Sequence, residues 1–208
     1  MHMLSRSALS GPIAVFLLLA ACGSAPPAFT APPTTIRTYY DLAANHPGFR
    51  NILIIGVAGE YASRASFERE LAAAITTDQV SAAAYYTVVG RTPRLTRGTL
   101  QTVIQSRRFD AVLLTRLKGQ EQEDLAPMRP VGAAFDLFGY DYDELNVDNR
   151  INPARAITFV TEVYATAGEK KVWSIDSLSF EKGTAGELIS EQVLTIAVQL
   201  QKDGVLAR

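Results

Sequence analysis

The chain has 208 residues, of which 48% are hydrophobic and 20% are charged, a composition typical of one globular domain. The formal charge of -1 excludes a general electrostatic attraction to nucleic-acid phosphates. The single cysteine, Cys22, excludes an intrachain disulfide, so the domain has to be stabilised by a hydrophobic core.

The first 21 residues predict a secretory signal peptide, in which Arg6 supplies the positive charge. The apolar run from Ile13 to Ala21 is too short to span about 30 Å of hydrocarbon as a helix. Its end, Leu19-Ala20-Ala21-Cys22, resembles the lipobox of bacterial lipoproteins at all four positions. The resemblance implies cleavage between Ala21 and Cys22 and lipid attachment to the cysteine thiol, with palmitate among the acyl chains.

Lipid attachment is favoured over two other roles for Cys22. A catalytic thiol needs a histidine held beside it, and Cys22 lies in a segment that is not expected to fold. An ordinary signal peptide with a chance cysteine does not account for the complete lipobox. In lipoproteins an aspartate after the cysteine favours the inner membrane, whereas Gly23 is present here, so the resemblance implies an outer-membrane anchor facing the periplasm.

Residues 22–36 are expected to form a proline-rich tether, because prolines remove the backbone donors that helices and strands need. A single α/β domain is expected over residues 37–208, with its folded part beginning between Ile36 and Phe49. Ile52–Ala58 is a continuous apolar run, which predicts the central strand of a parallel sheet.

Two helices and two further strands follow in the expected domain. Ser63 is expected to cap the first helix. Its inward positions are predicted to be Phe67, Leu71, Ala74 and Ile75, and its solvent-facing positions Glu68, Arg69 and Glu70. A second strand is expected over Ala83–Val89, a second helix from Thr96, and a third strand over Asp110–Leu117. Two successive strand-helix-strand units of this length imply parallel pairing.

Alternating apolar residues over 157–165, a turn at Ala167-Gly168 and a second run over 172–180 predict an appended hairpin. The last helix begins at the capping box Thr184-Ala185-Gly186-Glu187 and ends at Gly204. Its apolar stripe comprises Ile189, Val193, Ile196, Ala197 and Leu200. The expected fold is α/β, with a three-layer-like βαβαβ core, an appended β-hairpin and a C-terminal helix packed on a mostly parallel sheet.

The order of elements resembles, in topology, the small α/β domains of several envelope proteins: the TolB N-terminal domain, the curli channel lipoprotein and the lipoprotein activators of penicillin-binding proteins. The chain is also similar to a group of uncharacterised bacterial lipoproteins that combine a lipobox with two further features. These are a hairpin ending in a tryptophan-serine step, here Val172-Trp173-Ser174, and a closing helix ending like Leu200-Gln201-Lys202-Asp203-Gly204-Val205. The similarity covers most of the mature chain and implies no catalytic residue.

Few residues suit catalysis. His2 belongs to the signal peptide, which leaves His46 as the only imidazole for acid–base work or metal binding. The sequence lacks a Gly-x-Ser-x-Gly elbow, which disfavours a hydrolase built on a serine nucleophile. For an enzyme that uses carboxylates alone, Asp141 and Glu144 are the only close pair worth testing. We therefore expect no enzymatic activity, no catalytic residue and no cofactor other than the covalent lipid.

Two motifs resemble ligand loops incompletely. Gly56-Val57-Ala58-Gly59 follows the first strand, where a phosphate-binding turn would lie, but it lacks the third glycine and the lysine of such turns. A tight turn is favoured, and a weak anion site using Arg64 is the alternative. Asp141-Tyr142-Asp143 hints at a calcium loop, yet the sixth position is Asn146 and the twelfth is Asn152, so a solvated acidic loop without metal is favoured.

Three arginines spaced three residues apart, Arg91, Arg94 and Arg97, are candidate anion contacts. They predict an alternative function, a periplasmic binding module for a glycan or an anionic envelope ligand. Solvated charges that partly neutralise the acidic residues further along the chain are the favoured interpretation, because surface charges are common.

A long loop is expected at about 119–155, and loops of this length are usually functional or disordered. Its candidate partner contacts are Phe135, Phe138, Tyr140 and Tyr142. Such aromatic side chains bury a large area at a low entropic cost, although folding back over the sheet edge is an equal alternative. The predicted function is a membrane-anchored, non-enzymatic adaptor or assembly factor for periplasmic or outer-membrane proteins. Its expected partners are the lipid bilayer and an envelope protein.

Overall fold

The chain divides into two units, Met1–Ala31 and Pro32–Arg208. The computed structural model describes residues 35–43, 46–57, 60–90, 95–119, 151–154, 156–180 and 182–208, all within the second unit. For β1 and for residues 118 and 119 the description concerns the backbone alone.

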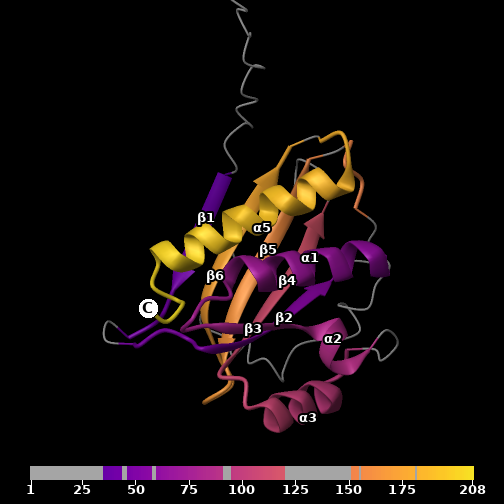
Figure 1. Ribbon diagram of the computed structural model, residues 1–208. Helices are drawn as coiled ribbons and strands as arrows, with labels where there is room; N and C mark the ends of the chain where they lie inside the picture. The colour runs from indigo at the N-terminus through magenta and orange to yellow at the C-terminus, as the bar shows by residue number, and fades with distance from the viewer. Residues whose placement is uncertain are drawn as a thin grey trace, which may run out of the picture. The chain divides into compact units, whose positions relative to one another are not determined.

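A sheet of six strands in the order β1-β6-β5-β4-β2-β3 forms the middle layer of this unit (Figure 1). The strands are β1 (Thr35–Tyr40), β2 (Asn51–Val57), β3 (Ser81–Ala84), β4 (Ala111–Gly119), β5 (Ile157–Ala165) and β6 (Lys170–Ser179). β2 pairs in parallel with β3 and β4, whereas the β4–β5, β5–β6 and β6–β1 pairs are antiparallel. The expected α/β fold is confirmed. Its sheet is mixed rather than mostly parallel, because the hairpin and β1 extend the parallel strands with antiparallel ones.

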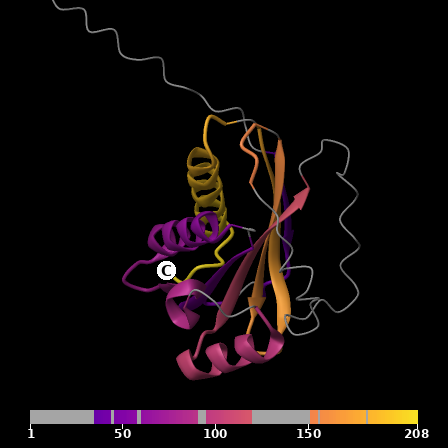
Figure 2. The same ribbon diagram turned by 90° about the vertical axis from the view of Figure 1, so that its right-hand side faces the viewer.

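Helices cover both faces of the sheet, which makes three layers. The long helices α1 (Tyr61–Ile75) and α5 (Ala185–Lys202) pack beside each other on one face, as the turned view in Figure 2 shows. The helices α2 (Tyr85–Val89) and α3 (Arg97–Arg107) follow β3 and pack on the other face.

Two hydrophobic cores lie between these layers. Successive residues of a strand point to opposite faces, so β2 supplies Ile52 and Ile54 to the core under α1 and α5. The same strand supplies Leu53 and Ile55 to the core over α3. The apolar run thus reflects a strand that is covered on both faces, as predicted. β2 is central among the three parallel strands, but in the whole sheet it lies next to the edge strand β3.

Several expected helix boundaries are confirmed. Thr96 Oγ1 accepts a hydrogen bond from the backbone N–H of Thr99, and α3 begins at the next residue, Arg97. The capping box joins the side chains and backbone N–H groups of Thr184 and Glu187 at the start of α5. All five residues of the predicted stripe on α5 are buried. The helix ends at Lys202, shortly before Gly204 adopts a φ of 67°.

Three predictions about the first helices and strands need correction. The strand expected over Ala83–Val89 ends at Ala84, and the rest of this run is helix α2. Helix α1 begins at Tyr61 rather than beyond Ser63, and its N-cap residue makes no side-chain hydrogen bond. Ala74 is exposed, because the buried side of α1 passes through the neighbouring position Ala72 instead.

The C-terminal residues complete the core under α1 and α5. The backbone N–H of Phe49 donates to the carbonyl of Val205 over 2.8 Å, and the N–H of Ala207 donates to the carbonyl of Phe49 over 3.0 Å. Val205, Leu206 and Ala207 are buried. The segment that precedes β2 is thereby held against the end of the chain.

The close approach of this segment to residues 205–207 requires a glycine at position 48. Its replacement by alanine is expected to destabilise the domain. Its φ is 78°, and a Cβ atom there would lie 2.4 Å from the backbone nitrogen of Ala207. Backbone strain and the clash together are expected to lower the free energy of unfolding by about 2 kcal/mol. Urea titration followed by circular dichroism measures this loss.

Gly90→Ala is the matched control, because Gly90 has a φ of 83° but no atom within 4 Å of the added Cβ. Its cost is the conformational strain alone, about 1 kcal/mol. Equal losses in the two variants would contradict a role for the close contact at Gly48.

Candidate functional site

A group of charged and aromatic residues lies at the carboxyl ends of the neighbouring parallel strands β2 and β3. We call Tyr61, Arg64, Glu68, Tyr85 and Tyr86 the strand-end cluster. β2 leads into α1 on one face of the sheet, whereas β3 leads into α2 on the other. In α/β proteins, ligands bind outside the carboxyl ends of parallel strands.

Glu68 is the centre of the cluster, and the prediction that it faces water is wrong. The residue is fully buried, and its Oε1 accepts a hydrogen bond from the Gly56 N–H over 3.0 Å. Its Oε2 accepts one from the Tyr86 N–H over 2.8 Å. The carboxylate therefore binds the end of β2 and the start of α2 to helix α1.

Burial raises the pKa of Glu68 to about 7, although its two backbone hydrogen bonds and the charge of Arg64 act in the opposite direction. Removal of the carboxylate from water thus outweighs the groups that stabilise its charge. At neutral pH the protein contains both the charged and the neutral form of Glu68.

Arg64 lies beside Glu68 on the same helix. Its Nε is 4.0 Å from Glu68 Oε1, and its guanidinium carbon is 5.4 Å from the centre of the Tyr61 ring. The Tyr61 and Tyr86 rings meet edge to face, with their centres 6.3 Å apart. The arginine is thus placed between a carboxylate and an aromatic face, both of which attract a cation.

The glycine turn after β2 is used for packing. A Cβ atom at Gly56 would lie 3.0 Å from the Phe67 ring, so the glycine lets α1 approach the strand closely. The Gly56 N–H, which a phosphate-binding turn would offer to a ligand, is bonded to Glu68. Ala58 and Gly59 lie outside the described residues.

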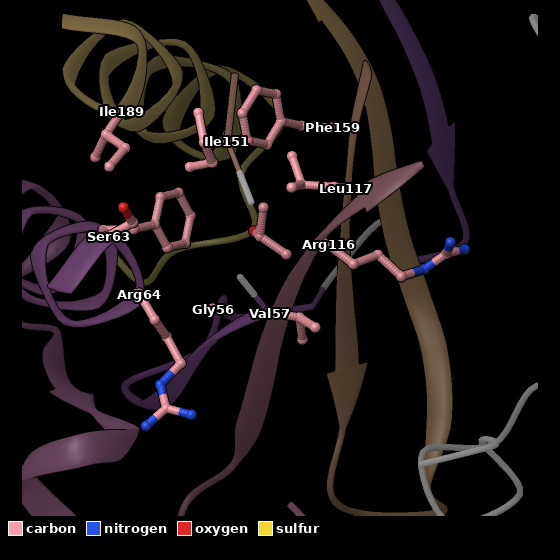
Figure 3. Close-up of a pocket in the computed structure, with 11 residues that line it drawn as sticks. Gly56, Val57, Ser63, Arg64, Arg116, Leu117, Ile151, Phe159 and Ile189 are labelled. Atoms are coloured by element: carbon pink, nitrogen blue, oxygen red, sulfur yellow. The ribbon is translucent and has the colours of Figure 1, made fainter. Parts of the chain in front are cut away.

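A pocket with about 300 Å³ of empty space adjoins Arg64 on its other side, between α1, α5 and the ends of β2 and β4. Figure 3 shows Leu117, Ile151 and Phe159 around it, whereas the guanidinium groups of Arg64 and Arg116 point away. Ser63 and Thr115 supply its hydroxyl groups, and Thr115 Oγ1 is hydrogen-bonded to Thr161 Oγ1 over 3.0 Å. This lining suits an apolar group and contains no carboxylate or imidazole.

A second buried ionic group lies on β5 and β6. Glu162 Oε1 accepts from Lys171 Nζ over 2.9 Å, and Glu162 Oε2 accepts from the Tyr164 hydroxyl over 3.0 Å. Glu162 is buried on the face of the sheet opposite α5. The alternation of this strand in the sequence already separates Glu162 and Tyr164 from the apolar face, but it does not show that Lys171 joins them.

His46, the candidate imidazole, has a structural role. Its Nδ1 accepts a hydrogen bond from the Gly48 N–H over 3.1 Å, and its ring packs 4.7 Å from the Phe49 ring. It precedes β2 in the chain and so lies at the amino end of the strand, away from the strand-end cluster. Within the described part of the chain, no group of three or more His, Cys, Asp or Glu residues is placed to hold a metal ion.

The structure describes only one of the other predicted site residues. Arg97 is the exposed first residue of α3. The predicted residues that lie outside the described ranges are Ala21, Cys22, Arg91, Arg94, Phe135, Phe138, Tyr140, Asp141, Tyr142 and Glu144. Their roles therefore stay predictions. Over the described ranges, no helix combines the length and the apolar character needed to cross a bilayer.

Comparison with known proteins found similarity to solved structures only. No family model and no curated protein matches the chain. The PelC dodecamer from Paraburkholderia phytofirmans has a TM-score of 0.47 and 10% identity, covering 85% of this chain and 99% of that one. A PelC dodecamer with one substitution, from the same organism, has a TM-score of 0.46 and 9% identity, covering 85% and 100%.

Lipoprotein GNA1162 from Neisseria meningitidis is also similar, with a TM-score of 0.37 and 15% identity over 72% of this chain and 98% of that one. At these identities the likeness concerns the fold alone.

Proposed function

We propose that the chain is a lipid-anchored protein of the bacterial envelope that acts as a non-enzymatic adaptor or assembly factor for periplasmic or outer-membrane proteins. The observation that carries the proposal is the complete lipobox Leu19-Ala20-Ala21-Cys22, followed by a proline-rich tether that leads into β1. Acyl chains on Cys22 would keep the domain within a few tens of ångströms of the membrane, at about 3.1 Å per tether residue. Gly23 follows the lipidated cysteine where an aspartate would favour the inner membrane, so we propose that the anchor lies in the outer membrane. We also propose that the domain is of the same type as the TolB N-terminal domain.

Two contacts among the described residues support a role without catalysis. His46, the only histidine after the predicted signal peptide, accepts a backbone hydrogen bond beside Phe49. Both oxygens of Glu68 accept backbone hydrogen bonds at the carboxyl ends of β2 and β3. The groups best suited to acid–base chemistry are thus engaged in holding the fold together.

Cys22→Ser is expected to abolish membrane attachment, because the hydroxyl group of serine does not accept the lipid. Several acyl chains, at about 0.8 kcal/mol for each buried methylene, account for a firm anchor, and the variant loses all of them. Cell fractionation and the intact mass of the processed chain measure the result. Ser24→Ala, two residues further along, should attach normally. A Cys22→Ser protein that still fractionates with membranes at its normal processed mass would refute the anchor.

The partner is best sought by crosslinking in intact cells, followed by identification of the attached proteins. Phe135→Ala and Phe138→Ala should reduce the crosslinked species while leaving the Tm unchanged, since large aromatic side chains anchor protein contacts. A lowered Tm in both variants would instead place these rings in the core and contradict their role as partner contacts.

A further inference from the structure

Two hydrogen-bond donors in the strand-end cluster have no acceptor. The Tyr85 hydroxyl and Arg64 Nε are both buried, and neither makes a hydrogen bond. Tyr85 is only 2% exposed, whereas 24% of the Arg64 side chain remains exposed. Native proteins satisfy nearly all buried polar groups, because removing such a group from water without a partner is unfavourable. Two unsatisfied donors in one cluster therefore indicate a group that accepts hydrogen bonds from them.

The charges around these donors select the chemistry of that acceptor. Burial raises the pKa of Tyr85 to about 12, while the charge of Arg64 lowers it and that of Glu68 raises it. Both charges are thus near enough to act on the hydroxyl, which stays protonated and able to donate at neutral pH. A guanidinium N–H and a phenol O–H can both donate to anionic oxygen.

We propose that the strand-end cluster binds a small oxyanion whose oxygens accept hydrogen bonds from Arg64 Nε and the Tyr85 hydroxyl. The anion binds beside Glu68 and does not replace it, since both Glu68 oxygens stay bonded to the backbone of Gly56 and Tyr86. The exposed part of Arg64 provides the way in, next to the Tyr61 ring. Oxyanion binding at this site does not require the lipid anchor. If no oxyanion binds, the membrane attachment tested by Cys22→Ser is unaffected.

Binding should be coupled to the protonation of Glu68. A charged Glu68 carboxylate 4.0 Å from Arg64 Nε repels an anion at the same nitrogen, whereas a neutral carboxyl group does not. The titratable groups that face Glu68 are Arg64 on α1 and Tyr85 on α2, and β2 offers only the Gly56 backbone. Affinity should therefore fall as the pH rises.

Calorimetric titration of the full mature chain in detergent with sodium acetate and with sodium sulfate tests the proposal, because both anions keep their charge between about pH 6 and pH 8. With a pKa near 7, Glu68 is neutral in about nine-tenths of molecules at pH 6 and in about one-tenth at pH 8. We expect saturable binding that weakens about tenfold between these two pH values. The tighter of the two ions identifies a carboxylate or a tetrahedral oxyanion as the ligand class.

Two substitutions locate the site. Tyr85→Phe removes only the hydroxyl, and Arg64→Lys keeps the charge but removes Nε. Each should weaken binding about tenfold at pH 6, the effect expected when one charge-assisted hydrogen bond is lost. Arg69→Lys, on the same helix with its side chain 63% exposed, is the matched control and should bind normally.

Three outcomes would overturn the proposal. The first is no binding of either ion by the wild-type chain at concentrations up to about 50 mM. The second is binding that survives both Tyr85→Phe and Arg64→Lys, which would mean an adventitious ion only. The third is binding with equal affinity at both pH values. If Tyr85→Phe fails to fold, Arg64→Lys and the pH dependence still decide the question.

Discussion

Replacing Trp173 with alanine is expected to lower the free energy of unfolding by about 4 kcal/mol, because the indole is completely buried in the core under α1 and α5. Trp173 lies on β6, and its Nε1 donates to Asp203 Oδ2 over 2.8 Å at the end of α5. The side chain thus joins the hairpin to the closing helix by packing and by a hydrogen bond. Urea titration should be followed by circular dichroism, since Trp173 is the only tryptophan.

Trp173→Phe and Asp203→Ala separate the two contributions. Phenylalanine keeps most of the packing but cannot donate to Asp203, and a lost hydrogen bond to a charged group costs about 2 kcal/mol. A double-mutant cycle with both substitutions should give a coupling energy of about 1 kcal/mol. A loss below about 1 kcal/mol for Trp173→Ala would contradict its place at the centre of this core.

The second large effect is a loss of stability as the pH rises. Burial raises the folded-state pKa of Glu68 from 4.5 to about 7, so the folded protein binds this proton more tightly than the unfolded chain does. The associated stability is fully present below about pH 4.5 and is lost as the pH rises through 7. The expected fall in the free energy of unfolding is about 3 kcal/mol, at about 1.4 kcal/mol for each pKa unit.

Glu68→Gln removes this titration, so its stability should change much less over the same pH range. The glutamine side chain can accept only one of the two backbone hydrogen bonds, which lowers its stability by a similar amount at every pH. Glu70→Gln, on the same helix with a partly exposed side chain, is the control and should retain the wild-type slope. Parallel curves for the wild type and Glu68→Gln would show that Glu68 does not cause the pH dependence.

The elements that local signals specify could be predicted from the sequence. The capping box at Thr184 marks α5, the hydroxyl of Thr96 marks α3, and the apolar run at Ile52 marks a strand covered on both faces. The sequence also draws attention to Val172-Trp173-Ser174 and to the end of the closing helix. It could not show that these two segments are joined by Trp173 and Asp203, since that contact depends on the packing of α5 across the sheet.

The parts that were missed depend on contacts between distant segments. A helical pattern places Glu68 toward water, and only the backbone N–H groups of Gly56 and Tyr86 explain its burial. β-Branched and aromatic residues favour a strand over Tyr85–Val89, but the hydrogen bond to Glu68 and the positive φ of Gly90 favour a helical turn. The candidate site could therefore be predicted only as a weak alternative built on Arg64.

Strand β1 was not predicted because it follows a proline-rich segment and its partner is far along the chain. It pairs with β6 without a break, from Thr35 opposite Leu178 to Tyr40 opposite Trp173. Six residues make only a short strand, and nothing in their own pattern identifies β6 as the neighbour.

The joining of early and late segments determines the order in which this molecule can assemble during its synthesis. Phe49 is hydrogen-bonded to Val205 and Ala207, and β1 can pair only after β6 has been made. By contrast, β2, α1 and β3 are close neighbours in the chain. A polypeptide delivered from its N-terminus can pair β2 with β3 across α1 first, but it cannot complete the core under α1 and α5 until Val205 and Ala207 have emerged. The fold is therefore completed only after most of the chain has been delivered.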